Sequence, residues 1–195
     1  MSLRSSYTVL APIYNAVVAR ATARLRERSL AALPRGAGSR ILVCGIGTGL
    51  DVPALPPGNL HVGIDLTRAM LARVPHRHDL ILAQGDAMRL PFPDATFDRS
   101  VLHLILAVVP HPERCLAEAA RATKRGGMIL VVDKFLRPGQ TAWLRRALNP
   151  LSRRIATRLD VVFEDVLARV PSLVVTEDVP ALAGGWFRRI RLEKR

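Results

Sequence analysis

The stretch that most constrains this chain runs from Arg40 to Leu55, where a short apolar segment leads into a glycine-rich loop. Ile41 to Cys44 form an unbroken apolar run, which is typical of a strand buried on both faces of a parallel sheet. Gly45, Gly47 and Gly49 follow at alternate positions. Glycine has no Cβ, so a ligand can approach its backbone closely. This combination predicts a site for a small polar ligand beyond the end of a buried strand.

A second apolar run supplies an acid at the spacing of a nucleotide-binding unit. The run from His61 to Asp65 reads as a strand, and Asp65 lies 20 residues after Gly45. An acid at about this distance from a glycine loop accepts hydrogen bonds from ribose hydroxyls. The glycines are spaced G-x-G-x-G, whereas a dinucleotide loop has G-x-G-x-x-G, so the spacing disfavours a dinucleotide. Taken alone, the loop is equally compatible with an ordinary tight turn.

Further segments extend the pattern in a fixed order along the chain. They are Val62–Leu71, Gln84–Phe92, Phe97–Asp98 and Thr123–Gly127, the last of which is read as a turn before a strand. With the glycine loop they cover about residues 40–133, and their order resembles that of class I S-adenosylmethionine-dependent methyltransferases. The resemblance implies an α/β, Rossmann-like fold with a seven-stranded, mostly parallel sheet, an antiparallel last strand and helices on both faces. It also implies S-adenosylmethionine as cofactor and S-adenosylhomocysteine as product.

The same resemblance assigns cofactor-binding positions in this sequence. The glycine loop is expected to hold the methionine part, the acid after the second strand the ribose, and the acid of the third motif the adenine. The implied set is Gly45, Gly47, Gly49, Asp65, Leu66, Met70, Asp86, Ala87 and Leu102. The family usually has an acid where this chain has Val43, and Asp51 is either its replacement or a solvated loop acid.

Three residues are candidates for the catalytic step, which requires an amine nucleophile to be neutral when it attacks. His103 closes the fourth predicted strand and can act as a base near neutral pH, although a lone histidine is more often a polar neighbour of a site. Tyr14 is a candidate hydrogen-bond acceptor, and Asp133 ends the fifth predicted strand, where it can equally cap the departing loop. Sequence alone does not choose among them. No His, Cys and Asp cluster has metal-ligand spacing, so no metal is expected.

The length of 195 residues fits a single methyltransferase domain covering 1–195. Within it we expect an amphipathic helical cover over 1–35 and a basic helical insertion over 137–160. The predicted strands are 40–44, 60–64, 79–83, 97–103, 127–133, 172–177 and 185–193. Besides the cover and the insertion, we expect a short helix that begins near Leu50 and further helices over 67–74, 113–123 and 161–169. Prolines 91 and 93 leave little room for a helix between the third and fourth strands.

The net charge of +13 is confined to two segments. Residues 1–40 hold seven arginines against one glutamate, residues 134–158 hold seven basic residues and no acid, and the rest of the chain balances. Both segments pair apolar and arginine-rich helical faces, which suits either a solvated helix packed on the core or docking to an anionic membrane surface. Localised basic charge indicates an anionic partner.

The segment Tyr7–Asn15 resembles the N-terminal segment of lipid and quinone methyltransferases. We therefore predict N-methylation of the amine head group of a phospholipid such as phosphatidylethanolamine, with a quinone precursor or another soluble small molecule as the alternative substrate. A nucleic-acid partner ranks last, because the basic segments carry few aromatic residues for base stacking.

The remaining features indicate a cytoplasmic protein, with a peripheral position on the inner face of the membrane under the lipid hypothesis. The two cysteines cannot build a disulfide framework. The sequence shows no secretory leader, and its apolar runs are shorter than a membrane span.

Overall fold

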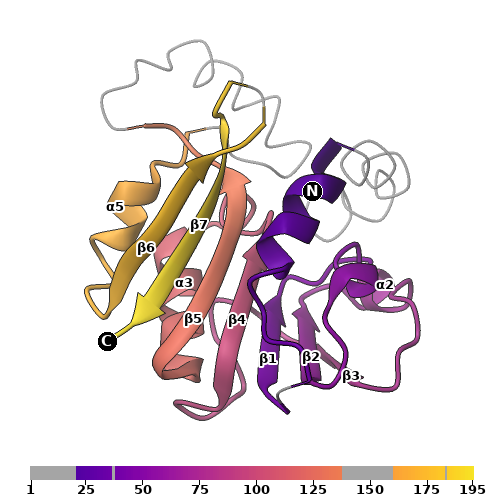
Figure 1. The fold of residues 1–195 in the computed structure, drawn as a ribbon. Helices are drawn as coiled ribbons and strands as arrows, with labels where there is room; N and C mark the ends of the chain where they lie inside the picture. Colours follow the sequence, from indigo (N-terminus) through magenta and orange to yellow (C-terminus); the bar gives the residue numbers. More distant parts are fainter. Residues whose placement is uncertain (1–20, 37, 138–159, 183) are drawn as a thin grey trace.

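A computed structural model describes residues 21–36, 38–137, 160–182 and 184–195 of the chain (Figure 1). Its centre is a seven-stranded sheet in the order β3-β2-β1-β4-β5-β7-β6. The strands are β1 (Arg40–Cys44), β2 (Leu60–Asp65), β3 (Leu80–Gln84), β4 (Phe97–His103), β5 (Thr123–Lys134), β6 (Leu173–Pro180) and β7 (Phe187–Lys194). The first five are parallel, and β7 pairs antiparallel with both β5 and β6. The predicted fold class is confirmed, including the antiparallel last strand.

Helical segments cover both faces of this sheet. The helix over residues 21–30, the 3-10 turn η1 (Val52–Ala54) and α2 (Arg68–Leu71) belong to one side. On the other side lie α3 (Pro112–Ala122) and α5 (Phe163–Leu167), drawn behind the sheet in Figure 1. The predicted helices near Leu50 and over 67–74 are shorter than expected. Residues 1–20 and 138–159, which hold most of the predicted cover and insertion, lie outside the described residues.

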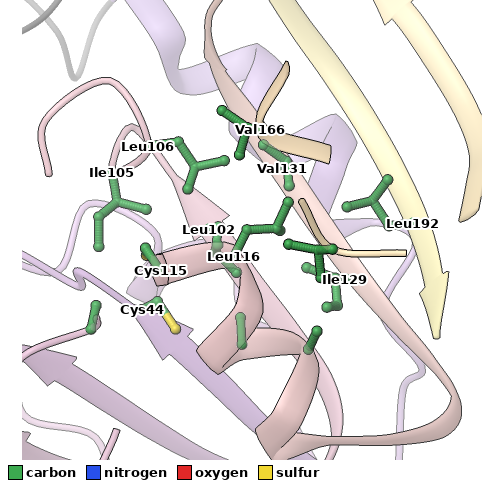
Figure 2. Packing of buried hydrophobic residues seen from close by; sticks show 14 of the residues in the cluster. Cys44, Leu102, Ile105, Leu106, Cys115, Leu116, Ile129, Val131, Val166 and Leu192 are labelled. Carbon is green, nitrogen blue, oxygen red and sulfur yellow. The ribbon is translucent and has the colours of Figure 1, made fainter. Parts of the chain in front are cut away.

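Alternation along the strands divides the core into two clusters, because successive side chains of a strand point to opposite faces. Ile41, Val43 and Leu130 pack with Leu30 and Leu33 of the 21–33 segment. The other cluster joins alternate strand residues to α3 and α5 (Figure 2). There Cys44 of β1 belongs to the same cluster as Cys115 and Leu116 of α3, and both cysteines are fully buried, free thiols.

The connection from β3 to β4 contains no helix, and residues 85–96 are all described. This agrees with the expectation drawn from the two prolines. At the sheet edge, β3 exposes Ile81 and Leu82, whose exposed fractions are 55% and 39%.

Residues 123–126 do not form the separate turn that the sequence suggested. They begin β5, and the ladder with β4 shifts register between Phe97 and Arg99. Gly126 absorbs the irregularity with a φ of +68°, which a residue with a Cβ rarely adopts.

Candidate active site

One cavity lies beyond the carboxyl ends of the first four strands, where open α/β sheets bind their ligands. Its wall consists of the loops that follow β1, β2, β3 and β4, together with Arg26 of the 21–30 helix. The lining residues are Arg26, Gly45–Thr48, Leu50, Asp51, Asp65–Thr67, Met70, Gly85–Met88, His103–Ile105 and Val108–Pro110.

The three loop glycines all have positive φ but serve two different purposes. A Cβ on Gly45 would lie 2.5 Å from Ile105, so this glycine permits a protein–protein contact. A Cβ on Gly49 would lie 2.9 Å from Pro75, which makes it a packing position too. Around Gly47 the nearest atom would be 4.0 Å away, and this residue borders the cavity. Gly47 is therefore the loop position whose missing side chain leaves room for a ligand.

Asp65 stands at the end of β2 with its carboxylate held by backbone donors. The N–H of Gly47 donates to Oδ2 and the N–H of Thr67 donates to Oδ1, each at 2.9 Å. Burial raises the pKa of this carboxyl, and the two N–H donors oppose that shift. Thr67 takes the N-cap position of α2, but its side chain makes no capping hydrogen bond. Asp65 thus joins the glycine loop to the next strand and still faces the cavity.

The loop after β3 adds a second carboxylate and apolar surface. Asp86 accepts a hydrogen bond at 2.8 Å from the N–H of Met88, which fixes the turn in front of the cavity. Met70 and Ala87 are buried side chains in the same wall, and Leu66 borders the cavity while remaining 40% exposed. A flat apolar ring with polar edges fits such a surface, because methionine and alanine can pack on its faces while the carboxylate and backbone meet its donors and acceptors.

A buried ion pair lies on the opposite side of the cavity, over β1 and β4. Arg26 Nη1 donates to Asp51 Oδ1 at 3.1 Å and also to the carbonyl oxygen of Leu50, while Nε donates to Thr22 Oγ1 at 3.1 Å. The two charged side chains are only 6% and 9% exposed. Charges removed from water to this degree need partners, and these two neutralise one another beside the cavity.

His103 extends this pair into a network. Its Nδ1 lies 3.0 Å from Asp51 Oδ2, and its Nε2 lies 3.0 Å from Ser29 Oγ. Burial favours the neutral form of Asp51, but His103 and then Arg26 favour the charged form more strongly and lower the pKa of that carboxyl. Both ring nitrogens of His103 thus have protein partners, and the imidazole ties the end of β4 to the loop after β1 and to the 21–30 helix.

The chain leaves β4 through a strained residue. Leu104 has a φ of +57°, and its N–H donates to the carbonyl oxygen of Val132 at 2.7 Å. A left-handed conformation costs a leucine about 1–2 kcal/mol and persists only where the surroundings enforce it. Asp133 helps to enforce it, because its buried carboxylate accepts the N–H of Ala107 at 2.9 Å. The turn directs the apolar segment Ile105–Pro110 along the cavity.

The structure brings together most of the residues that the sequence singled out. Gly45, Gly47, Asp65, Leu66, Met70, Asp86, Ala87 and His103 all border the cavity. Three others lie outside the lining: Gly49 packs against Val74 and Pro75, Leu102 is buried in the same core cluster as α3, and Asp133 anchors the loop after β4. Tyr14 lies outside the described residues.

Two contributors were missed, Arg26 and Ser29. Both fall on the buried stripe of the 21–30 helix, whereas the neighbouring Arg24 and Arg28 are exposed. The available signal was an arginine spaced one residue after Leu25 and three before Ser29, on the apolar side of an amphipathic helix.

The described residues contain neither a metal-ligand cluster nor a membrane-spanning helix. They contain no group of three His, Cys, Asp or Glu side chains placed to hold a metal ion. In the same part of the chain, no helix combines the length and the apolar character needed to cross a bilayer.

Sequence comparisons connect this site to known enzymes. Residues 42–131 match a family model described as a methyltransferase domain. The chain is 36% identical over 177 residues to phosphatidylethanolamine N-methyltransferase of Cereibacter sphaeroides, with 87% of each protein covered. It is 30% identical over 189 residues to a demethylmenaquinone methyltransferase of Streptomyces griseus, covering 89% of this chain and 80% of that protein.

Solved structures share the fold at lower identity. An S-adenosylmethionine-dependent methyltransferase of Thermotoga maritima, described as a possible histamine N-methyltransferase, superposes with a TM-score of 0.74 at 19% identity and covers 99% of this chain and 100% of its own. A geranyl diphosphate methyltransferase in complex with S-adenosylmethionine gives 0.67 at 16% identity, covering 90% and 85% of the two chains.

Proposed function

Because this chain belongs to the S-adenosylmethionine-dependent methyltransferases, we propose that it methylates the amine head group of a phospholipid such as phosphatidylethanolamine at a membrane surface. The observation that carries the lipid assignment is the 36% identity to a phosphatidylethanolamine N-methyltransferase across 87% of both proteins. The basic segments of the sequence support it, because a lipid substrate has to be reached at an interface that attracts cations.

The cavity suits the cofactor in its shape and polarity. Gly47 leaves open space on its cavity side, as a loop in contact with a ligand requires. Asp65 offers carboxylate oxygens to the ribose hydroxyls, and Asp86 and Met70 flank the region proposed for the adenine. When bound, S-adenosylmethionine would supply an electrophilic methyl group on a positively charged sulfur; the new N–C bond would form as the C–S bond breaks, with S-adenosylhomocysteine as the leaving group and the amine's proton passing to a base or to water. Of the chain's own residues, Ile105, Val108 and Val109 would exclude water from the reacting centre.

The predicted candidates for proton removal differ in their relation to the cavity. His103 borders it, Asp133 lies outside its lining, and Tyr14 belongs to the part of the chain that is not described. Both ring nitrogens of His103 already have protein partners, Asp51 and Ser29, so we keep Tyr14 as the candidate for proton transfer to test by mutation.

The alternative substrate is a quinone precursor or another soluble small molecule. It is supported by the relatives named demethylmenaquinone methyltransferase, one of which aligns with 89% of this chain. The two substrates are separated by an assay with radiolabelled cofactor, purified protein, and either phosphatidylethanolamine vesicles or a demethylated quinone. Label in the lipid fraction supports the proposal, whereas label in the quinone alone overturns it.

Membrane docking is tested by charge reversal in the second basic segment. Changing Arg145, Arg146, Arg153 and Arg154 to Glu should weaken sedimentation with anionic vesicles strongly, because each basic residue near an anionic surface contributes about 1 kcal/mol. Binding of the wild type should also fall as salt rises. Affinity for the cofactor should stay nearly constant, because the proposed cofactor residues lie in other segments.

A matched control reverses four exposed arginines that lie outside both basic segments, Arg114, Arg125, Arg169 and Arg195. This control changes the net charge equally and should retain more vesicle binding than the first variant. Equal losses would reduce the effect to net charge, and wild-type protein that ignores anionic vesicles at low salt would favour the soluble substrate.

A further inference from the structure

The order of the strands gives the cavity a direction. Asp86 follows β3, Asp65 follows β2, the glycine loop follows β1 and His103 ends β4, and these strands are consecutive neighbours in the sheet. A ligand with its adenine near Asp86 and its ribose at Asp65 therefore extends toward β1 and β4. The charged groups on that side are Arg26 and Asp51, with His103 beside them.

The part of the cofactor that points this way is an amino acid, with an ammonium and a carboxylate on one carbon. Its carboxylate needs donors, for which the planar fork of an arginine is well shaped, and its ammonium needs an acceptor such as a carboxylate. Among the described residues that line the cavity, Arg26 is the only arginine or lysine. Asp51 accepts one hydrogen bond on each oxygen, and an ionised carboxylate offers about four acceptor positions.

Asp51 can also replace the acid that the family usually has at position 43. Val43, where the family pattern has an acid, is 1% exposed and packs in the apolar cluster under the 21–33 segment. It offers nothing to an ammonium. Asp51 comes from the far end of the same loop and presents its carboxylate to the cavity.

His103 sets the orientation of that carboxylate. The imidazole is fixed from two directions, at 3.0 Å from Asp51 Oδ2 and 3.0 Å from Ser29 Oγ, and its side chain is 3% exposed. Ser29 and Arg26 lie on the same helix three residues apart, so one helix holds both the imidazole and the guanidinium.

We propose that Arg26 and Asp51 bind the carboxylate and the ammonium of the cofactor's amino-acid end, and that His103 is a positioning residue that holds Asp51 for this contact. The proposal rests on the cofactor and not on the methyl acceptor, so it stands or falls independently of the lipid assignment.

Calorimetry with two ligands tests it. S-adenosylhomocysteine carries the amino-acid end, whereas 5′-methylthioadenosine keeps the adenosine and sulfur but lacks that end. Arg26→Gln and Asp51→Asn should each weaken S-adenosylhomocysteine by about 10- to 150-fold, the range for a lost hydrogen bond to a charged group, and leave methylthioadenosine within twofold of wild type. Equal weakening of both ligands, or of neither, overturns the assignment.

A third ligand separates the two roles. Decarboxylated S-adenosylhomocysteine retains the ammonium, so Asp51→Asn should still weaken it and Arg26→Gln should not. Arg77→Gln and Asp79→Asn serve as matched controls, because they alter another Arg–Asp pair, which lies away from the cavity, and should bind all three ligands as wild type does. If a variant loses every ligand, Arg26→Lys and Asp51→Glu replace it, since they keep the charges but change the contact geometry. Weakening confined to the ligands that carry the contacted group supports the assignment, and equal weakening of all ligands overturns it.

His103 is tested by kinetics. A positioning role predicts that His103→Leu raises the KM for the cofactor, keeps kcat within a few-fold at saturating cofactor, and leaves the pH profile of kcat in place. His103→Asn, which keeps a side-chain amide near the position of Nδ1, should recover most of the affinity for S-adenosylhomocysteine. A fall in kcat of about 10²- to 10⁴-fold with unchanged KM would instead identify a general base and overturn the positioning role.

Discussion

Arg–Asp–His groups occur at both ends of the sheet, and they differ in what surrounds them. The cavity group consists of Arg26, Asp51 and His103 at the carboxyl ends of the strands. The basal group consists of His61, Arg77 and Asp79 at the amino-terminal ends of β2 and β3. All three members of the cavity group line the cavity, and none of the basal group does.

The basal group joins backbone segments. Arg77 pairs with Asp79 through two hydrogen bonds of 2.5 and 2.8 Å, and its Nη1 donates to the carbonyl oxygens of Val52 and Leu55 at 3.0 and 2.8 Å. It therefore fastens the η1 turn to the start of β3. His61 is fully buried 3.7 Å from Asp79, and neither of its ring nitrogens has a hydrogen-bond partner in the described part of the chain.

The contrast shows that the same three residue types can line a cavity or join backbone segments away from it. In the cavity group both histidine nitrogens are bonded, and the charged pair borders open space. In the basal group Arg77 donates to backbone carbonyl oxygens, and the side chain of His61 is fully buried. We therefore expect changes on the cavity side to alter ligand binding, and changes on the basal side to alter the free energy of unfolding.

The largest effect is expected from Gly47→Val. The new side chain would fill the space left for the ligand, so calorimetry should show S-adenosylhomocysteine binding weakened more than about 100-fold, or at least 2.7 kcal/mol. The left-handed φ should cost about 1–2 kcal/mol of stability. Gly126→Val is the matched control, because Gly126 also has positive φ and open space but lies at the start of β5. It should lose similar stability and keep its affinity, and equal affinities of the two variants would make the loop an ordinary turn.

Asp65→Ala should come next. Removing the carboxylate takes away a charged acceptor for the ribose, which is worth about 1.5–3 kcal/mol of binding free energy. Calorimetry of the folded variant measures this loss. Asp98→Ala provides the comparison, since Asp98 also accepts a backbone N–H, from Arg40, at the other end of the sheet. Unchanged affinity in Asp65→Ala would reject the ribose assignment.

Sequence reasoning predicted the strands better than the ligand site, for a physical reason. Each strand leaves a local apolar signature, and β1 and β4 were predicted with the bounds Arg40–Cys44 and Phe97–His103 that the structure has. The purposes of Gly45 and Gly49 depend on Ile105 and Pro75, which are distant in the chain, so their spacing could not distinguish them from Gly47. The contact of Arg26 with Asp51 likewise depends on the packing of the 21–30 helix over the loop that follows β1, which no local sequence pattern indicates.

On the basal side, Asp79→Ala should lower the free energy of unfolding by about 2 kcal/mol, because Arg77 loses two charge-assisted hydrogen bonds in a poorly exposed site. Denaturant titration measures the loss. Cofactor affinity at a temperature where the variant is folded should be unchanged. A variant of normal stability with impaired binding would erase the distinction between the two groups.

The smallest effect concerns pH and His61. Burial, and then the charge of Arg77, lower the pKa of His61 in the folded protein below its usual range. The unfolded chain takes up a proton below about pH 6.5 while the folded protein resists it, so stability should fall toward pH 5 with a slope of up to about 1.4 kcal/mol per pH unit. Urea titrations of His61→Leu should show a weaker slope than wild type. The exposed His76→Ala is the control and should keep the wild-type slope.

The two buried cysteines, Cys44 and Cys115, allow local unfolding of the core to be measured by the rate of their alkylation. Burial raises the pKa of the Cys44 thiol to about 12 and places that of Cys115 well above its ordinary value. A thiol reacts with alkylating reagents as the thiolate, so neither sulfur should be modified while β1 and α3 stay together. The rate at which iodoacetamide labels the native protein then reports how often β1 and α3 separate, without any engineered cysteine. Cys44 directly precedes the glycine loop. A ligand that stabilises the folded state should therefore lower the alkylation rate in proportion to its occupancy.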